Sequence, residues 1–296
     1  MTNGKKCAVF ILLGQSNAVG HGIPMDEAER IVTPMKNVFG LARAENQSFD
    51  IDRLCFSGYT SHSMNLAETQ DHTHSVANGL AARWQAHIDA GNAYGLPDLY
   101  IIHIAIGAQG VTEGYLWHPE TEKILIPGVL GKVKISLFSF TSHIFSLLDA
   151  YFAEAGKEYE VIGLHWRGGE NDITAPRETL AEDLQAIYTV LFERFHTLLH
   201  TPPVILHRLV CIDRMHDLDP TGELEYFEKM QIINAEFDRL AACYENVSVF
   251  DPATAPQYRE DIRGNGLFIR DNVHFTPEVN GWVADKILSD YVKQNK

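Results

Sequence analysis

A run of seven apolar residues near the amino terminus limits the folds open to this chain. It extends from Cys7 to Leu13 between a lysine pair and Gly14, which is typical of a strand buried on both faces. Such a strand needs helices on both sides of its sheet. Gly14 permits a tight turn at the carboxyl end, where open α/β sheets place their ligands. Ser16 follows this turn and is a candidate nucleophile, although a serine here is also typical of a turn or a helix cap.

Strand-like and helix-like segments alternate along the rest of the chain. Further strands are predicted at 99–106, 161–166, 203–210 and 247–250, and helices at 75–90, 133–152, 177–199, 224–240 and 277–291. This alternation predicts an α/β fold with a parallel sheet covered on both faces. Residues 21–74 are poor in periodic apolar positions, so we expect a long loop region with short elements lying over the site.

Composition limits the size of the core and the kinds of partner. With 296 residues and 45% hydrophobic residues, the chain can form one large core, and residues 1–296 are predicted to be a single domain. Its 39 acidic and 24 basic residues give a formal charge of -15, which argues against nucleic acid and anionic membranes as partners. No apolar stretch approaches the length of a membrane span. The oligomeric state is left open.

The four cysteines, Cys7, Cys55, Cys211 and Cys243, are scattered without Cys-x-x-Cys spacing. They are interpreted as buried free thiols, because neither a disulfide framework nor a zinc site is indicated. This favours a reducing compartment, the cytoplasm. The lysine pair before the first apolar run resembles the start of a signal peptide, but removal of that run would remove Ser16. Secretion of a processed form is the alternative.

Residues 71–74, with the sequence Asp-His-Thr-His, offer good ligand types for a metal site. No third or fourth ligand is evident nearby, and exposed loops collect polar residues. The chain is therefore predicted to hold no metal and to need no cofactor.

A partner for Ser16 comes from the other end of the chain. Asp271 and His274 lie three residues apart in a turn before a helix that Thr276 caps and Pro277 begins. His274 could take the proton of the Ser16 hydroxyl during attack on a carbonyl, while Asp271 fixes the tautomer and stabilises the imidazolium. This combination predicts acyl transfer through a serine nucleophile.

The ends of the predicted strands supply candidate oxyanion donors. They are the N–H groups of Ser16 and Gly107 and the side-chain amide of Asn171, each donor typically contributing about 3 to 4 kcal/mol to barrier lowering. A tight turn is the alternative for Gly107. Candidates for substrate binding are Gln15, Gln109, Trp117, Arg167 and Glu170. Trp117 is explained equally well as a packed aromatic, and Glu170 as a structural tie between strand ends. His103, inside a predicted strand, is interpreted as a hydrogen-bonded core residue. His21, His62, His207 and His216 are interpreted as solvated or core residues.

Four blocks carry a resemblance to a known superfamily. Gly14-Gln15-Ser16-Asn17, the Gly107 turn, the Gly-Glu-Asn-Asp sequence at 169–172 and Asp271-x-x-His274 stand in the order of the blocks of SGNH hydrolases. The Gly-Gln-Ser-Asn form and the Thr-Pro after His274 resemble the sialate O-acetylesterase and acetylxylan esterase branch. The resemblance spans residues 7 to about 290 and implies a flavodoxin-like, three-layer α/β/α sandwich with a mainly parallel five-stranded sheet.

The same resemblance implies metal-free removal of O-acetyl groups from a carbohydrate by a serine esterase, with an acyl-enzyme. The acetylated sugar of xylan, sialic acid or a related carbohydrate is the expected partner. Gly168 stands where that branch usually has Gln, which is a departure that bears on the third oxyanion donor. Two alternatives stay open: an esterase or lipase of the wider superfamily acting on non-sugar acyl esters, and an inactive carbohydrate-binding relative.

Overall fold

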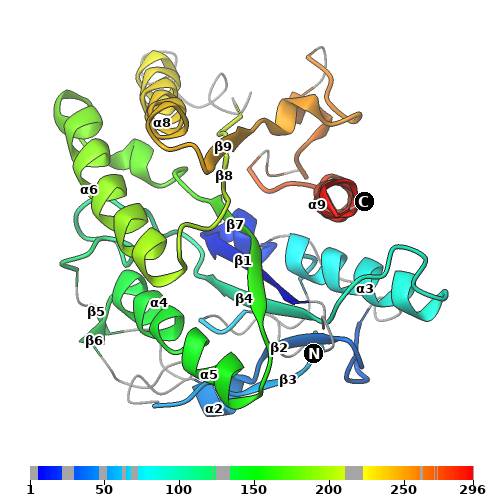
Figure 1. The fold of residues 1–296 in the computed structure, drawn as a ribbon. Coiled ribbons are helices and arrows are strands. Elements are labelled where there is room, and N and C mark those ends of the chain that lie inside the picture. Colours follow the sequence, from blue (N-terminus) through cyan, green and yellow to red (C-terminus); the bar gives the residue numbers. More distant parts are fainter. Residues whose placement is uncertain are drawn as a thin grey trace.

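The computed structural model describes most of the chain as a twisted sheet between helices (Figure 1). The described residues are 6–21, 30–46, 52–61, 65–67, 73–121, 123–124, 134–210, 223–260, 263–269, 271 and 273–295. The main sheet consists of β1 (Cys7–Gly14), β2 (Val38–Leu41), β3 (Phe56–Gly58), β4 (Leu99–Ala105), β7 (Tyr159–Arg167), β8 (Val204–His207) and β9 (Val247–Phe250). A separate antiparallel pair is formed by β5 (Lys123–Ile124) and β6 (Lys134–Ile135).

The helices are α1 (Ser16–Val19), α2 (Arg43–Asn46), α3 (Val76–Asp89), α4 (Leu137–Ser146), α5 (Leu148–Glu154), α6 (Arg177–Leu198), α8 (Glu223–Cys243) and α9 (Pro277–Gln294). Two long helices begin at the side chains that the sequence suggested. The Ser75 hydroxyl accepts a hydrogen bond from the Asn78 N–H at the start of α3, and Thr276 does the same for Val279 at the start of α9. Each cap pairs an N–H that the first helical turn leaves without an intrahelical partner.

The central strand, β1, is bonded in parallel to β4 on one side and to β7 on the other. The strand order is β3-β2-β4-β1-β7-β8-β9, and every pairing in it is parallel except that of β2 with β3. After β4 the chain crosses to the other side of β1 to form β7. The order of the strands therefore reverses beside β1, which is where open parallel sheets form a crevice at their carboxyl ends.

Alternate residues of β1 face two different hydrophobic clusters, as strand geometry requires. Val9 and Ile11 pack with α4, α6 and α8, whereas Phe10 and Leu12 pack with α3 and α9. All eight residues of β1 are buried. Figure 1 shows the same arrangement, with the green and yellow helices on one side of the sheet and α3 and α9 on the other. The predicted three-layer α/β/α class is confirmed.

The prediction of five strands was wrong in number. Two further strands, β2 and β3, come from residues 21–74, and they extend the sheet beyond β4 at one edge. The described strands of this region thus build the sheet edge and do not lie over the site. The two strands are only four and three residues long, too short to give a periodic signal.

The helix expected over 133–152 is interrupted. It begins at Leu137, after the Ser136 hydroxyl accepts a hydrogen bond from Ser139, and it divides at Leu147 into α4 and α5. There the Leu147 N–H bonds to the carbonyl of Ile144, three residues back, a tightening typical of a helix end. Apolar density predicted the helical state but not this break.

The cysteines are free in the described residues, but only Cys7 is buried. Cys55 is half-buried and Cys243 is exposed at the end of α8, so the prediction of buried thiols was wrong for both. Cys211 lies outside the described residues. His103 and His207 are core residues as expected: His103 bonds to the carbonyl of Ala18 and His207 to the ring of His165.

Gly14 is the tightest point of the turn after β1, and we predict that it tolerates no side chain. Its φ is +137°, and a Cβ there would lie 1.9 Å from the backbone oxygen of Arg167. The Gly14→Ala substitution should therefore lower the free energy of unfolding by more than about 3 kcal/mol, from overpacking and backbone strain together. Urea denaturation measures this change.

Gly91→Ala is the matched control for that experiment. Gly91 also has a positive φ, +100°, but nothing lies within 4 Å of its added Cβ. Only the backbone strain of about 1–2 kcal/mol is expected there. Equal losses in the two variants would contradict the close approach of the β1 turn to Arg167.

Candidate active site

Ser16 stands at the carboxyl end of the central strand. It is the first residue of α1, directly after the Gly14-Gln15 turn, and it is 9% exposed. The Gln15 N–H donates to the carbonyl of Arg167 at 3.0 Å, which ties the turn to the end of β7. The indole of Trp117 donates to the Gly14 carbonyl at 2.9 Å. The turn that presents Ser16 is thus held from two neighbouring elements.

Asp271 and His274 form a bonded pair on the loop that leads to α9. The His274 Nδ1 lies 2.6 Å from the Asp271 Oδ2. The His274 side chain is 21% exposed and the Asp271 side chain 34%. The other carboxylate oxygen accepts the N–H groups of Val273 and His274. Burial on its own would raise the pKa of the Asp271 carboxyl, but these bonds from His274 and Val273 outweigh it and lower the pKa. The carboxylate thus stays ionised and pairs with Nδ1. The other ring nitrogen of His274, Nε2, is not used by Asp271.

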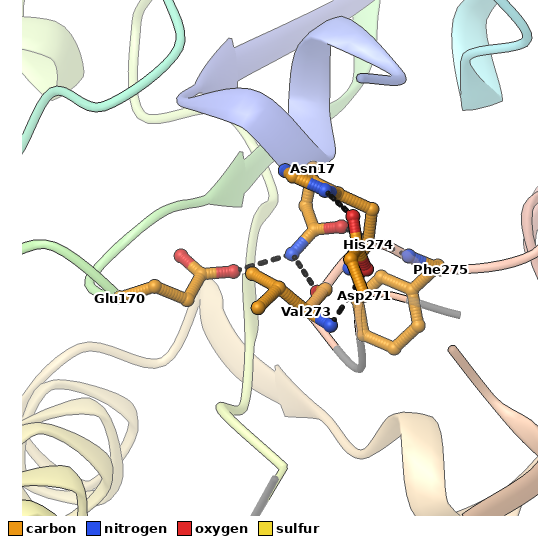
Figure 2. Close-up of polar contacts among 6 residues, drawn as sticks. All are labelled: Asn17, Glu170, Asp271, Val273, His274 and Phe275. Carbon is orange, nitrogen blue, oxygen red and sulfur yellow. Dashed lines mark hydrogen bonds and ion pairs between the residues drawn. The ribbon is translucent and has the colours of Figure 1, made fainter. Parts of the chain in front are cut away.

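Contacts of Asn17 and His21 bring the two ends of the chain together. The Asn17 side chain bonds to the backbone of Val273 and of Phe275, which flank His274 (Figure 2). The centre of the His21 ring lies 5.9 Å from that of the His274 ring, and the backbone N–H of His21 donates to the Ser16 carbonyl. These contacts join the turn that carries Ser16 to the loop that carries His274, and the catalytic roles of the two residues stay a prediction.

The candidate oxyanion residue Gly107 reaches the same cluster. A Cβ on Gly107 would lie 2.5 Å from the His21 Nε2, so the turn after β4 runs directly against the His21 ring. The following loop is fixed by Asp172, whose Oδ1 accepts the N–H groups of Val111 and Thr112 and the Thr112 hydroxyl, each at 2.9 Å. Asp172 is fully buried and thereby joins the loops that follow β4 and β7.

Asn171, the third candidate oxyanion donor, sits in the turn after β7. Its backbone carbonyl accepts the N–H and the hydroxyl of Thr174 at 3.1 and 2.8 Å, and the residue is half-buried. These bonds fix the backbone of the turn that ends at Thr174. The assignment of the Asn171 side chain to an oxyanion hole stays a prediction.

The predicted substrate-binding residues divide into buried and half-buried groups. Gln15, Trp117 and Arg167 are at most 2% exposed, and their contact with a sugar stays a prediction. Trp117 packs edge-on against Trp166, in line with the packed-aromatic alternative. Glu170 and Gln109 are half-buried; Glu170 accepts hydrogen bonds from Gln15 and Asn17, and Gln109 accepts one from Leu116.

Arg167 is a buried cation without a carboxylate bonded to it in the described contacts. Its Nη1 donates to the Asn17 carbonyl at 3.0 Å and to the Asn280 Oδ1 at 2.8 Å, and its guanidinium lies 4.8 Å from the centre of the Phe275 ring. Burial lowers its pKa to about 10, and the charge of Glu170 opposes that shift. Arg167 also lines a cavity of about 20 Å³, which has room for a water molecule.

Sequence reasoning missed the parts played by Asn17, His21 and Asp172. Asn17 lies in the Gly-Gln-Ser-Asn motif and Asp172 in the Gly-Glu-Asn-Asp motif, but no sequence pattern indicates their hydrogen-bond partners. His21 was interpreted as a solvated or core residue. Its position, one turn beyond Ser16, was the available signal.

No group of three potential metal ligands occurs among the residues that the structure describes. Asp71 and His72, which make up half of the candidate metal motif, lie outside those residues. His62 and His216 lie outside them as well. None of the described helices has both the length and the apolar character needed to cross a membrane.

No known family profile matches this sequence, and no curated protein does so. Among solved structures, NanS matches with a TM-score of 0.57 and 14% identity, over 99% of this chain and 100% of its own. A protein from Arabidopsis thaliana matches with a TM-score of 0.53 and 14% identity, over 96% and 99%. Est24, a carbohydrate acetylesterase from Sinorhizobium meliloti, follows at 0.46 and 15%, over 96% and 99%.

The first two likenesses extend over nearly the whole chain and show its fold. At this identity they do not show an activity. They confirm the α/β fold implied by the resemblance to SGNH hydrolases.

The contribution of the buried Asp172 to the free energy of unfolding should become more favourable as the pH falls. Burial raises its pKa to about 6, although the bonds from Thr112 and Val111 act in the opposite direction. An unfolded Asp titrates near 3.9, so the folded state gains a proton first as the pH falls. The ionised Asp172 thus opposes folding above about pH 6, and this cost disappears between about pH 6 and pH 4.

The Asp172→Asn variant removes that titration while keeping an oxygen for the three bonds. Thermal or urea unfolding from about pH 7.5 to about pH 4.5 should show wild type gaining about 2 kcal/mol relative to the variant. Asp271→Asn is the control with the opposite sign. Its lowered pKa contributes stability above the unfolded pKa that is lost as the pH falls through the folded value. A pH-independent difference for Asp172→Asn would contradict this account.

Proposed function

We propose that this protein is a serine esterase that removes O-acetyl groups from a carbohydrate. The observation that carries the proposal is the bonded Asp271 and His274 pair, joined by Asn17 to the turn that presents Ser16. Nucleophile, base and orienting carboxylate come from opposite ends of the chain. Gly107 lies against the His21 ring, close to this turn. Because glycine has no Cβ, its backbone N–H can approach an oxyanion closely.

In the first half of the reaction, the Ser16 Oγ attacks the acetyl carbonyl carbon while its proton moves to the His274 Nε2. The carbonyl oxygen becomes an oxyanion, for which the N–H groups of Ser16 and Gly107 and the Asn171 amide are the proposed donors. Asp271 stabilises the imidazolium. The bond to the sugar oxygen then breaks, and His274 returns the proton to that oxygen, leaving an acetyl group on Ser16.

In the second half, water attacks the acetyl-Ser16 carbonyl and gives its proton to His274. Collapse of the second tetrahedral intermediate breaks the bond to the Ser16 Oγ, which regains its proton from His274. The products are acetic acid and the deacetylated sugar. This chemistry requires no metal or cofactor.

The choice of an acetylated sugar rests on the motif resemblance. The Gly-Gln-Ser-Asn form at 14–17 and the Thr-Pro that follows His274 resemble the sialate O-acetylesterase and acetylxylan esterase branch. The fold shared with NanS is compatible with that assignment. Xylan, sialic acid and simple hexose acetates are therefore the substrates to compare.

Substitution of the nucleophile gives the direct test. We expect Ser16→Ala to lose at least about 10³-fold in kcat on p-nitrophenyl acetate and on acetylated sugars, because the covalent route is removed. Ser248→Ala, at an exposed position on β9, is the control and should retain wild-type turnover. Turnover that survives the Ser16→Ala change would refute the proposed function.

Two further measurements separate the alternatives. A fluorophosphonate probe should label wild type at Ser16 and leave Ser16→Ala unlabelled, which an inert carbohydrate-binding protein would not do. A series of p-nitrophenyl esters from acetyl to octanoyl should show a steep preference for acetyl. A flat or rising profile would favour an esterase for non-sugar acyl chains.

The third oxyanion donor is open to a separate test, since Gly168 replaces the Gln typical of the resembled branch. We expect Asn171→Ala to lower kcat about 10²- to 10³-fold with KM little changed, because an oxyanion donor acts in the transition state. Asn171→Asp, which lacks the amide donor but keeps the size, should lose as much. Retention of activity in both variants would remove Asn171 from the proposed oxyanion hole.

A further inference from the structure

The Asn17 side chain grips the backbone on both sides of His274. Its Oδ1 accepts the N–H of Phe275 at 3.1 Å, and its Nδ2 donates to the carbonyl of Val273 at 3.2 Å (Figure 2). Asn17 is 4% exposed, so water competes little for these bonds. Because Asn17 directly follows Ser16, one amide connects the turn of the proposed nucleophile with the loop of the proposed base.

Glu170 fixes the orientation of that amide. Its Oε1 accepts the second hydrogen of the Asn17 Nδ2 at 2.7 Å, and its Oε2 accepts the side-chain amide of Gln15. An ionised carboxylate only accepts hydrogen bonds, so Nδ2 must face Glu170 and Oδ1 must face the Phe275 N–H. The two residues that flank Ser16 are therefore both bonded to one carboxylate.

Several other hydrogen bonds near His274 join residues of its own region of the chain. Asp271 bonds to Val273 and His274, which shapes the loop internally. The Thr276 N–H donates to the Leu267 carbonyl, and the Ile269 N–H donates to the His274 carbonyl. These bonds do not determine where the loop lies relative to Ser16. The bonds of Asn17 do, and Arg167 supports them by donating to the Asn17 carbonyl and to Asn280 and by lying against the Phe275 ring.

We propose that Asn17 and Glu170 are positioning residues that hold His274 in register with Ser16. This inference rests on the proposed function. Neither side chain has to touch the substrate, because each acts through the backbone of Val273 and Phe275 or through the other. Displacement of a catalytic group by about 1 Å can lower the rate about 10²-fold, so loss of this register should reduce kcat far more than substrate binding.

A double-mutant cycle tests the pair. Asn17→Asp places a carboxylate oxygen against Glu170 and against the Val273 carbonyl, and we expect kcat to fall about 100-fold with KM changed less than about threefold. Glu170→Gln, whose amide can suit only one of its two donor partners, should lose about tenfold. In the double variant the amide introduced at position 170 can donate to the carboxylate introduced at position 17. Activity should therefore recover at least about tenfold over Asn17→Asp.

The matched control is Asn46→Asp. Asn46 is also buried and also bonds backbone groups on another segment, namely the N–H and the carbonyl of Cys55, but at the edge of the sheet. Its substitution should lower stability as Asn17→Asp does while kcat stays within about twofold. If Asn17→Asp loses no more activity than Asn46→Asp, or if the double variant is as impaired as the product of the singles, the positioning role is overturned.

Hydrogen exchange provides a readout that does not depend on activity. In Glu170→Gln, which leaves Asn17 itself intact, the Phe275 N–H should lose at least about tenfold in protection because its acceptor is no longer held in place. The neighbouring Thr276 N–H, bonded to Leu267, should change less than about threefold. Unchanged protection at Phe275 would overturn the proposal even if Glu170→Gln loses activity.

The two proposals can fail separately. If Ser16→Ala stays active, the serine mechanism is wrong, and the exchange at Phe275 still decides whether Glu170 orients Asn17. If Ser16→Ala is inactive while the Asn17 and Glu170 variants match Asn46→Asp, the esterase function stands and the positioning role falls.

Discussion

The position of β1 between two parallel partners is the constraint on which the rest of the structure depends. All of its residues are buried, so its backbone groups must bond within the sheet, which fixes it against β4 and β7. At its end Gly14 lies so close to the Arg167 backbone that the turn has little freedom. The chain also reverses its direction of strand addition beside β1. The loops that follow β1, β4 and β7 therefore meet at the carboxyl ends of the strands, where they are bonded to one another.

Those loops are joined by a few polar side chains that bond to backbone or to each other. Asp172 holds the loop after β4 against the one after β7, and Glu170 holds the turn after β1 through Gln15 and Asn17. Such bonds are directional and largely shielded from water, so they fix relative positions more sharply than apolar packing does. Burial shields the bonds of Asp172 from water, but it also raises the pKa of the carboxyl, so the ionised form opposes folding.

Much of the fold could be predicted because it follows from local patterns. The long apolar runs at β1, β4 and β7 and the capped helices α3 and α9 gave clear periodic or terminal signals. The short strands β2 and β3 gave none, because their strand character comes from pairing with the sheet edge and with each other. The break at Leu147 gave no signal either, because it lies within an apolar stretch that is helical on both sides.

The sequence by itself determined which chemical groups are available: a serine after a buried strand, an Asp and a His three residues apart, and glycines at strand ends. Tertiary structure decided what those groups contact. It buried Arg167 and Trp117, which the sequence offered as sugar contacts. It also brought the Asn17 side chain within hydrogen-bonding distance of Val273 and Phe275, the two residues that flank His274. The physical reason is that burial and hydrogen-bond partners arise between segments distant in the chain. Asn17 and Phe275 are 258 residues apart, and only the folded sheet brings them within bonding distance.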